Sequence, residues 1–400
     1  MMILSILYFT LFVRCEVSPT PIDPPVVAAP DTGMLALQWE RELGGNSSSI
    51  YDPMVCEQGV TFTRPSSNPD DVITCLDKAT SEVMWKWGDT NLTNGSAVSS
   101  ITGTHTNGHS IFINSAATLI SINGTSGTND WKTLASGGCY GKRSNMINGY
   151  IYLIHDDCYP YEQAGIVRYP ISGGDFDTLV MFSMVDDYEL FLNAPSLSVK
   201  PNGDSLLIFR LGSFNFHTSD ARQDLVAYNL ATRTIEWRKD DFEPTGDSNI
   251  RPVTVYDSKV YVMGKYTLHC FDANTGQKLW EKPEPGGLMG NVNLTIAEGK
   301  VFVKPTNSHF KAYDAQTGDL VWDVSSSNIS PNGSVYYKGH LFITGGWSGI
   351  YVHRVSDGKL VYLKNFADSQ RYLALTAWPQ GLTVPPTCFS ATPRLTLIFF

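Results

Sequence analysis

Histidine and acidic residues are the side chains of this 400-residue chain that first suggest chemistry. His105 and His109 lie four residues apart, a spacing that aligns two metal ligands on a helix, but Asn107-Gly108 between them predicts a turn. Asp156-Asp157 and Asp186-Asp187 carry oxygen atoms that suit calcium, yet neighbouring acids in loops are generally solvated. We therefore assign no catalytic, cofactor-binding or metal-binding residue from the sequence.

Cysteines offer a second kind of chemistry. In an oxidising compartment, the candidate disulfides are Cys56 with Cys75 and Cys139 with Cys158, because each pair falls within one unit of the repeat described below. Buried free thiols are an equally good interpretation of all four residues.

The N-terminus predicts export. Residues 1–15 are mostly apolar and read as a signal sequence, and residues 16–33 form a Pro-rich flexible tether. The apolar run is shorter than the roughly 20 residues that span a bilayer. Cys15 resembles the lipidated cysteine of bacterial lipoproteins, although Arg14 stands where a small residue is expected. We expect the periplasm, the outer membrane or the extracellular space, with any membrane attachment made through Cys15.

Composition limits the partners. The chain carries 42% hydrophobic residues, 34 Gly and 22 Pro, which predicts a large core with many turns. Its formal net charge of −10 argues against binding nucleic acid, because phosphate binding is dominated by Lys and Arg. We expect a monomer that binds envelope proteins or peptides.

A ten-residue unit recurs along the chain. Its clearest copies run from Phe271 to Trp280 and from Tyr313 to Trp322, and their terminal tryptophans belong to a series of aromatic residues that recurs every 40 to 46 residues over much of the chain. Turn dipeptides such as Glu298-Gly299 precede a second series of β-type runs in the same phase. Each period therefore predicts two hairpins, which make four strands. The signature residues are Asp77, Trp85, Trp131, Trp237, Asp272, Gly276, Trp280, Asp314, Gly318 and Trp322.

Turn chemistry explains these residue types. Asp272 can accept backbone N–H groups, and Gly276 supplies a positive φ that other residues adopt at a cost. Trp280 then begins the outgoing strand, where its indole can pack against a neighbouring sheet while its N–H finds an acceptor. One such sheet cannot bury both faces alone, so the sheets must pack around a ring.

Counting outer strands predicts an all-β, eight-bladed propeller of four-stranded antiparallel blades over residues 34–400, with seven blades as the alternative. A strand that ends at Trp39 would complete the last blade and close the ring. Residues 381–400 have no turn signature of the kind found in the good copies, so we expect the last blade, after residue 363, to be irregular. The insertions Asp156–Pro160 and Phe214–Asp220 are the expected specificity loops.

Asp272-Ala-Asn-Thr-Gly276 with Trp280, and Asp314-Ala-Gln-Thr-Gly318 with Trp322, resemble the pyrroloquinoline-quinone-like (quinoprotein-like) β-propeller repeat family. The size, the export signal and the single-propeller plan are similar to its BamB-like members. That resemblance implies a scaffold for envelope proteins, related to outer-membrane assembly, without a cofactor. The family also contains quinoprotein dehydrogenases, which typically carry two adjacent cysteines under the quinone, and this chain has no such pair.

Three functions remain open at this point. The leading hypothesis is a non-enzymatic exported scaffold that binds partner proteins. A dehydrogenase that uses pyrroloquinoline quinone with calcium is the first alternative. A carbohydrate-binding propeller is the second, and Trp347 in Gly345-Gly-Trp-Ser-Gly349 could then stack on a sugar, although a packed core tryptophan explains it better.

Overall fold

A computed structural model describes most of the repeat region and one short segment beyond it. The described residues are 39–42, 51–56, 59–63, 72–89, 101–115, 118–134, 144–156, 163–184, 188–215, 217–243, 251–285, 287–288, 294–305, 309–325, 329–345, 349–365 and 396–399. Every element among them is a β-strand. No helix in this part of the chain is long and apolar enough to cross a membrane.

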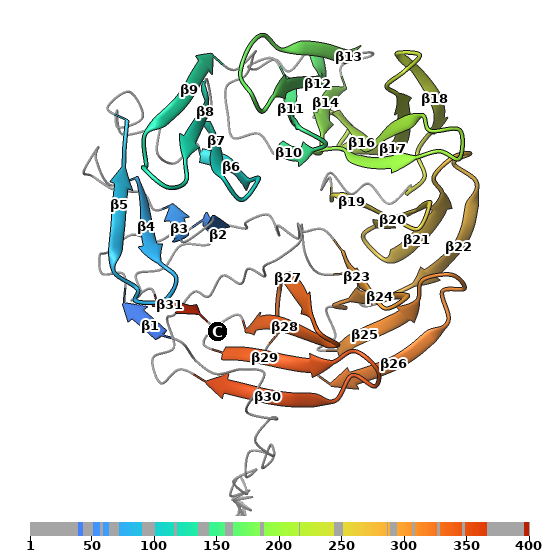
Figure 1. Ribbon diagram of the computed structural model, residues 1–400. Helices are drawn as coiled ribbons and strands as arrows, with labels where there is room; N and C mark the ends of the chain where they lie inside the picture. Colours follow the sequence, from blue (N-terminus) through green and yellow to red (C-terminus); the bar gives the residue numbers. More distant parts are fainter. Residues whose placement is uncertain are drawn as a thin grey trace, which may run out of the picture.

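Seven antiparallel blades form a ring around a central axis (Figure 1). In chain order, their strands are β2 (Tyr51–Cys56), β3 (Gly59–Thr63), β4 (Ile73–Asp77) and β5 (Val83–Trp87) in blade 1; β6 (Ile101–Thr106), β7 (Ser110–Ser115), β8 (Thr118–Asn123) and β9 (Asn129–Leu134) in blade 2; β10 (Ser144–Ile147), β11 (Tyr150–Asp156), β12 (Gln163–Pro170) and β13 (Asp177–Ser183) in blade 3; β14 (Glu189–Leu192), β15 (Ser196–Val199), β16 (Ser205–Asn215), β17 (Asp220–Asn229) and β18 (Thr234–Lys239) in blade 4; β19 (Val253–Tyr256), β20 (Lys259–Met263), β21 (Thr267–Asp272) and β22 (Lys278–Pro283) in blade 5; β23 (Thr295–Ala297), β24 (Lys300–Val303), β25 (His309–Asp314) and β26 (Leu320–Ser325) in blade 6; β27 (Ile329–Tyr337), β28 (His340–Gly345), β29 (Gly349–Arg354) and β30 (Leu360–Asn365) in blade 7.

The prediction of eight blades is wrong, and the alternative of seven is confirmed. The expected eighth unit is represented among the described residues by a two-stranded sheet, in which β1 (Trp39–Glu42) pairs antiparallel with β31 (Thr396–Phe399). Its strand begins at Trp39, where the sequence predicted a strand to end. Counting aromatic residues overestimated the blades because the stretch after Tyr362 carries no Asp-Gly turn to define further hairpins.

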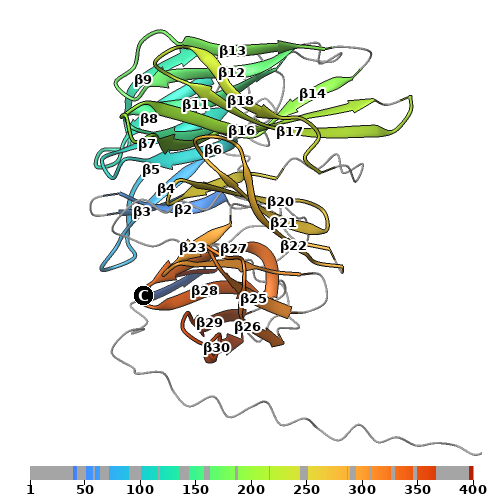
Figure 2. The same ribbon diagram turned by 90° about the vertical axis from the view of Figure 1, so that its right-hand side faces the viewer.

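Each blade runs from the central axis outward in chain order. In blade 5, for example, the order is β19, β20, β21 and β22, and each strand pairs with the next. Blade 4 keeps the same four positions, but β14 and β15 share the innermost one by pairing with different halves of the long β16. The insertion that includes Phe214 to Asp220 therefore lengthens β16 and β17, which project beyond the neighbouring blades in Figure 2.

The core lies between neighbouring sheets. The two middle strands of a blade are buried over most of their length, whereas outer strands such as β22 alternate between exposed and half-buried residues. One apolar cluster joins Leu206 and Leu225 of blade 4 to Val260 and Phe271 of blade 5. Because each sheet buries apolar side chains against its neighbours, no blade has a core of its own.

A β-bulge interrupts the outer strand of every blade. In blade 6, Ala312 faces Trp322 and Tyr313 faces Leu320, so Val321 is the extra residue. The same one-residue shift occurs between the third and outer strands of the other six blades. A bulge adds local twist and makes a strand edge a poorer template for another chain.

Candidate functional site

The signature tryptophans join each blade to the next one. The indole N–H of Trp322 donates to the carbonyl oxygen of Val355 at 2.9 Å, and a Cβ added to Gly358 would lie 2.7 Å from the Trp322 ring. A tryptophan of one blade therefore lies flat against the turn glycine of the following blade, which has no side chain to hold it away. The same pair of contacts joins Trp85 to Gly124 and Gly127, Trp131 to Ile171 and Gly173, Trp237 to Ala273 and Gly276, and Trp280 to Ala315 and Gly318.

The acidic position of the unit shapes that turn. The Asp314 carboxylate accepts the backbone N–H groups of Gln316 and Thr317, both at 2.8 Å. These hydrogen bonds hold the pKa of Asp314 below its usual value, and the same arrangement lowers the pKa of Asp77. The predicted turn chemistry is thus present, and it serves the contact between blades.

The junction between blades 3 and 4 has neither the tryptophan nor the glycine. Arg233 takes the turn position with φ +58°, and its guanidinium donates to the Asp177 carboxylate and to the carbonyl oxygen of Thr178 in blade 3. This ion pair lowers the pKa of Asp177. A charged contact therefore stands where the other described junctions have an indole against a glycine.

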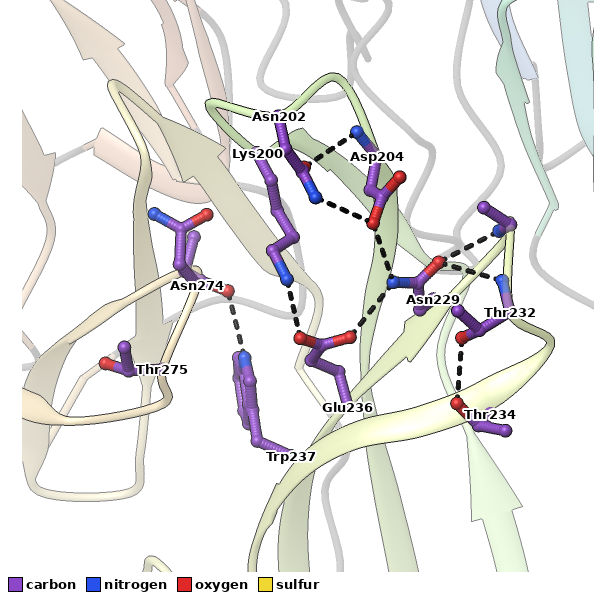
Figure 3. A network of polar contacts seen from close by, with 12 residues as sticks. Lys200, Asn202, Asp204, Asn229, Thr232, Thr234, Glu236, Trp237, Asn274 and Thr275 are labelled. Carbon is purple, nitrogen blue, oxygen red and sulfur yellow. Dashed lines mark hydrogen bonds and ion pairs between the residues drawn. The ribbon is translucent and has the colours of Figure 1, made fainter.

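Blade 4 also carries a polar network at the same end of the ring (Figure 3). The bulge residue Glu236 accepts from Lys200 at 2.6 Å and from Asn229 at 2.9 Å. Asn229 also donates to Asp204 at 3.3 Å, while its own oxygen accepts two N–H groups of the turn. Hydrogen bonds from Lys200 and Asn229 lower the pKa of Glu236. Because Lys200 neutralises Glu236 and Asn229 donates to its second oxygen, this network acts as a brace within the blade.

A belt of side-chain hydrogen bonds links the innermost strands. Thr295 of β23 donates to the carbonyl oxygen of Ser334 in β27 at 2.6 Å, and Ser196 donates to that of Val253 at 2.8 Å. Similar bonds join His105 to Ser144, Asn145 to Pro195 and Thr254 to Leu294, so the belt runs from blade 2 to blade 7. The polar side chains of the belt face the next blade and are occupied there.

The two ends of the ring differ in how their connections are built. The turn face carries two-residue turns such as 257–258 and the signature turns such as 273–277, and the two sets are hydrogen-bonded to each other. The opposite end, which we call the loop face, carries the remaining connections, among them 240–252, 264–266 and 284–294. Of these, 240–252 and 284–294 are longer than the turns of the opposite face, and binding sites are disproportionately built on longer connections over a rigid scaffold.

A buried charged cluster holds the loop face between blades 4 and 5. Glu243, which follows β18, lies 2.5 Å from Nε2 of His269 in β21 and accepts the backbone N–H of Lys265. Arg210 of β16 is fully buried and donates to the carbonyl oxygen of Met263 at 2.8 Å. Burial opposes the ionisation of Glu243, but the hydrogen bond and charge of His269 outweigh it and lower its pKa.

Blades 5 and 6 repeat that arrangement with other residues. Glu284 follows β22, is buried, and accepts from Lys311 at 2.9 Å and from the hydroxyl of Tyr313. Lys311 occupies the position of β25 that His269 occupies in β21, three residues before the acidic turn residue. Burial and the Glu284 hydrogen bond raise the pKa of Tyr313. A carboxylate thus fixes the start of each of these two connections.

Exposed side chains of two kinds lie near these anchors. Tyr266 is 42% exposed, and the Lys265 ammonium lies 5.2 Å from the centre of its ring. At the tip of the long hairpin, Tyr188 donates to Asp220, and the Arg222 guanidinium lies 4.5 Å from the Tyr188 ring. Tyrosine and arginine are the residue types that contribute most to protein interfaces. The described part of the loop face therefore offers candidate contact residues on a fixed frame.

The structure separates the two histidines that were considered as metal ligands. His105 is buried and bonds to Ser144 at 2.7 Å, whereas His109 is exposed on the turn face. Burial lowers the pKa of His105 to about 4, so it is neutral at pH 7. Cys15, Cys139, Cys158, Asp157, Asp186-Asp187 and Trp347 lie outside the described residues, as does the side chain of Asp156.

The candidate disulfide between Cys56 and Cys75 is not formed. Both side chains are fully buried thiols that form no disulfide. Cys56 lies on β2 and Cys75 on β4, and β3 runs between them. Placing two cysteines in one blade was therefore not enough, because the blade order keeps these strands apart.

Calcium bound with pyrroloquinoline quinone would need a group of oxygen ligands. Among the described residues, no three or more His, Cys, Asp or Glu side chains come together as a group that could hold a metal. The polar side chains of the inner belt are engaged with the next blade. We derive no step through that cofactor.

Comparisons with known protein sequences find similarity to one group of proteins. Residues 221–372 match the family model described as "Outer membrane protein assembly factor BamB". A protein of that name from Bordetella pertussis is 29% identical over 129 residues, which cover 31% of this chain and 32% of the relative. Another from Francisella salina is 30% identical over 98 residues, 24% of this chain and 18% of the relative. These matches span well under half of each relative.

Solved structures show the same architecture. BamB from Moraxella catarrhalis has a TM-score of 0.54 at 13% identity, covering 82% of this chain and 91% of that one. Quinohemoprotein alcohol dehydrogenase from Comamonas testosteroni has a TM-score of 0.60 at 10% identity, covering 83% and 69%. At such identities the likeness concerns the fold. The molecule is a repeat β-propeller, and its repeats in residues 221–372 belong to the pyrroloquinoline-quinone-like β-propeller repeat family.

Proposed function

We propose that this chain is a non-enzymatic, exported scaffold that binds partner proteins of the cell envelope, in a role related to outer-membrane protein assembly. The observation that carries the proposal is the difference between its two ends. The signature turns are committed to inter-blade contacts, whereas the loop face combines anchored connections with exposed Tyr266 and Arg222. The similarity to proteins named outer-membrane assembly factors supplies the class of partner.

The bulges in the outer strands favour partner binding through side chains over binding by strand addition. Strand addition to a blade needs a regular free edge, and every outer strand is interrupted directly before the position of the signature aromatic. We therefore assign the partner contact to side chains of the loop face.

Two tyrosines of blade 5 provide a matched test. Tyr266 is 42% exposed on the loop face, and Tyr256 is 38% exposed beside the turn 257–258 on the turn face. We would measure binding of the purified chain to a purified bacterial outer-membrane assembly complex by biolayer interferometry. Since interface tyrosines contribute about 2 kcal/mol or more as hot spots, Tyr266→Ala is expected to weaken binding by roughly 30-fold.

The Tyr256→Ala variant is the control and is expected to bind like the wild type. Equal losses in the two variants would contradict the assignment to the loop face. No binding by the wild-type chain at micromolar concentrations would contradict the proposed partner class.

A further inference from the structure

Three sulfur atoms gather in blade 1, close to its junction with blade 2. The Cys75 thiol lies 4.0 Å from the Met84 thioether sulfur, and the Cys56 thiol, on the same face of the sheet, donates to the carbonyl oxygen of Gly124 in blade 2 at 3.7 Å. Cys56 and Cys75 are fully buried, and half-buried Met84 packs against the same apolar cluster. Met84 is the bulge residue of β5, so the bulge brings the thioether to the thiols.

Gly59 makes room for this cluster. It pairs directly with Cys56 across β2 and β3, and a Cβ at Gly59 would lie 2.2 Å from the Cys75 sulfur and 3.4 Å from that of Met84. The Cys75 sulfur therefore occupies the space of the missing side chain. Directly paired Cβ positions lie about 5 Å apart, which brings this sulfur within reach of the Cys56 side chain.

The same topology opposes a disulfide. Neighbouring strands lie about 4.8 Å apart, so β2 and β4 are separated by about 9.6 Å across β3. Bridged cysteines have Cα atoms within about 7 Å of each other. The sulfur atoms of Cys56 and Cys75 can approach each other, but a covalent bond between them would require β2 and β4 to move.

Metal coordination suits these distances better. Three sulfur ligands that surround one ion at about 2.3 Å lie about 4 Å from each other, which is the spacing of Cys75 and Met84. Two thiolates and a thioether form a soft ligand set, which favours Cu(I) over harder ions. We propose that Cys56, Cys75 and Met84 form a binding site for a Cu(I) ion.

Binding would involve proton release and no electron transfer. Cu(I) would form three bonds to sulfur, and the two thiol protons would leave to solvent as the S–H bonds break. The affinity for Cu(I) should therefore increase with pH.

Blade 5 contains a natural control. Cys270 occupies the position of Cys75, since each faces the signature tryptophan of its blade. The residues Tyr256, Lys259 and Leu279 stand where blade 1 has Cys56, Gly59 and Met84. Burial raises the pKa of Cys270 to about 12, but no second sulfur ligand occupies these positions.

The test is an anaerobic titration of the reduced full-length chain with Cu(I) in competition with bicinchoninate. Wild type and Cys270→Ser should each bind one equivalent of Cu(I) more than Cys75→Ser. The cysteines other than Cys75 and Cys270 are present in all three proteins, so any Cu(I) that they bind is the same in each. Met84→Leu keeps the packing volume and should lower the affinity at least tenfold, with one sulfur fewer in the X-ray absorption spectrum.

Two results would overturn the site. One is equal Cu(I) binding by Cys75→Ser and Cys270→Ser together with an unchanged affinity in Met84→Leu. The other is a peptide in which mass spectrometry finds Cys56 bonded to Cys75 in the protein purified without reductant. Circular dichroism identifies a variant that fails to fold, in which case Met84→Leu decides.

Discussion

A glycine of the repeat can be needed for its positive φ or for the close contact of a tryptophan ring, and a comparison of Gly318 with Gly299 distinguishes these two roles. Both lie in turns of blade 6 with similar positive φ values, +71° and +68°. A Cβ at Gly318 would lie 2.7 Å from the Trp280 ring, whereas nothing lies within 4 Å of one at Gly299. Alanine in this conformation costs about 1–2 kcal/mol at either position. At Gly318, the displaced indole adds about 1–3 kcal/mol, as overpacking generally does.

We therefore expect Gly318→Ala to destabilise the protein by about 2–5 kcal/mol and Gly299→Ala by about 1–2 kcal/mol. The measurement is the denaturant midpoint, followed by circular dichroism and tryptophan fluorescence. In a Trp280→Ala background the extra cost of Gly318→Ala should disappear, because the two changes act on one contact. Equal costs at the two glycines, or strict additivity with Trp280→Ala, would refute the interpretation of the signature as an inter-blade contact.

Three further changes probe the other contacts. Trp322→Phe removes the hydrogen bond to the carbonyl oxygen of Val355 and leaves that buried oxygen without its indole donor. The free energy of unfolding should therefore fall by about 1–3 kcal/mol in denaturant titrations. Folding lowers the pKa of His105 from 6.5 to about 4, so the stability that depends on neutral His105 is fully present above pH 6.5 and is lost as the pH falls. The free energy of unfolding should therefore decrease by about 2 kcal/mol between pH 7 and pH 5. His105→Asn should remove this part of the pH dependence. Glu243→Gln weakens the buried bond to His269 and should cost about 1–3 kcal/mol at pH 7 without changing the far-ultraviolet circular dichroism.

Short-range chemistry made the repeat predictable from the sequence. The acidic residue, the glycine and the tryptophan of a unit lie within ten residues, and each has one physical task, so two good copies define the blade. The coupling between copies was missed. Arg233 replaces the glycine of blade 4, and the outer strand of blade 3 lacks the tryptophan that would have needed it. That joint loss was a signal in the sequence that the two residues meet.

The loop-face anchors could not be predicted in this way. Glu243 lies six residues after its signature tryptophan and Glu284 lies four after its own, so they share no fixed spacing. Their partners, His269 and Lys311, lie in the next blade and differ in type. The inner belt is equally hidden, because a lone Ser or Thr in a strand has many possible partners. Contacts of this kind depend on the packing of one blade against the next.

The signature explains why similarity to this family identifies the fold more readily than the function. Its residues join one blade to the next on the turn face, so they determine how the blades pack. The matched residues 221–372 contain the contacts made by Trp237, Trp280 and Trp322, and the solved structures of an assembly factor and of a dehydrogenase share the fold of this chain. Differences in function must then come from residues the ring does not use. In the described part of this chain, those include Tyr266 and Arg222 on the loop face, where substitutions should change binding while leaving the ring intact.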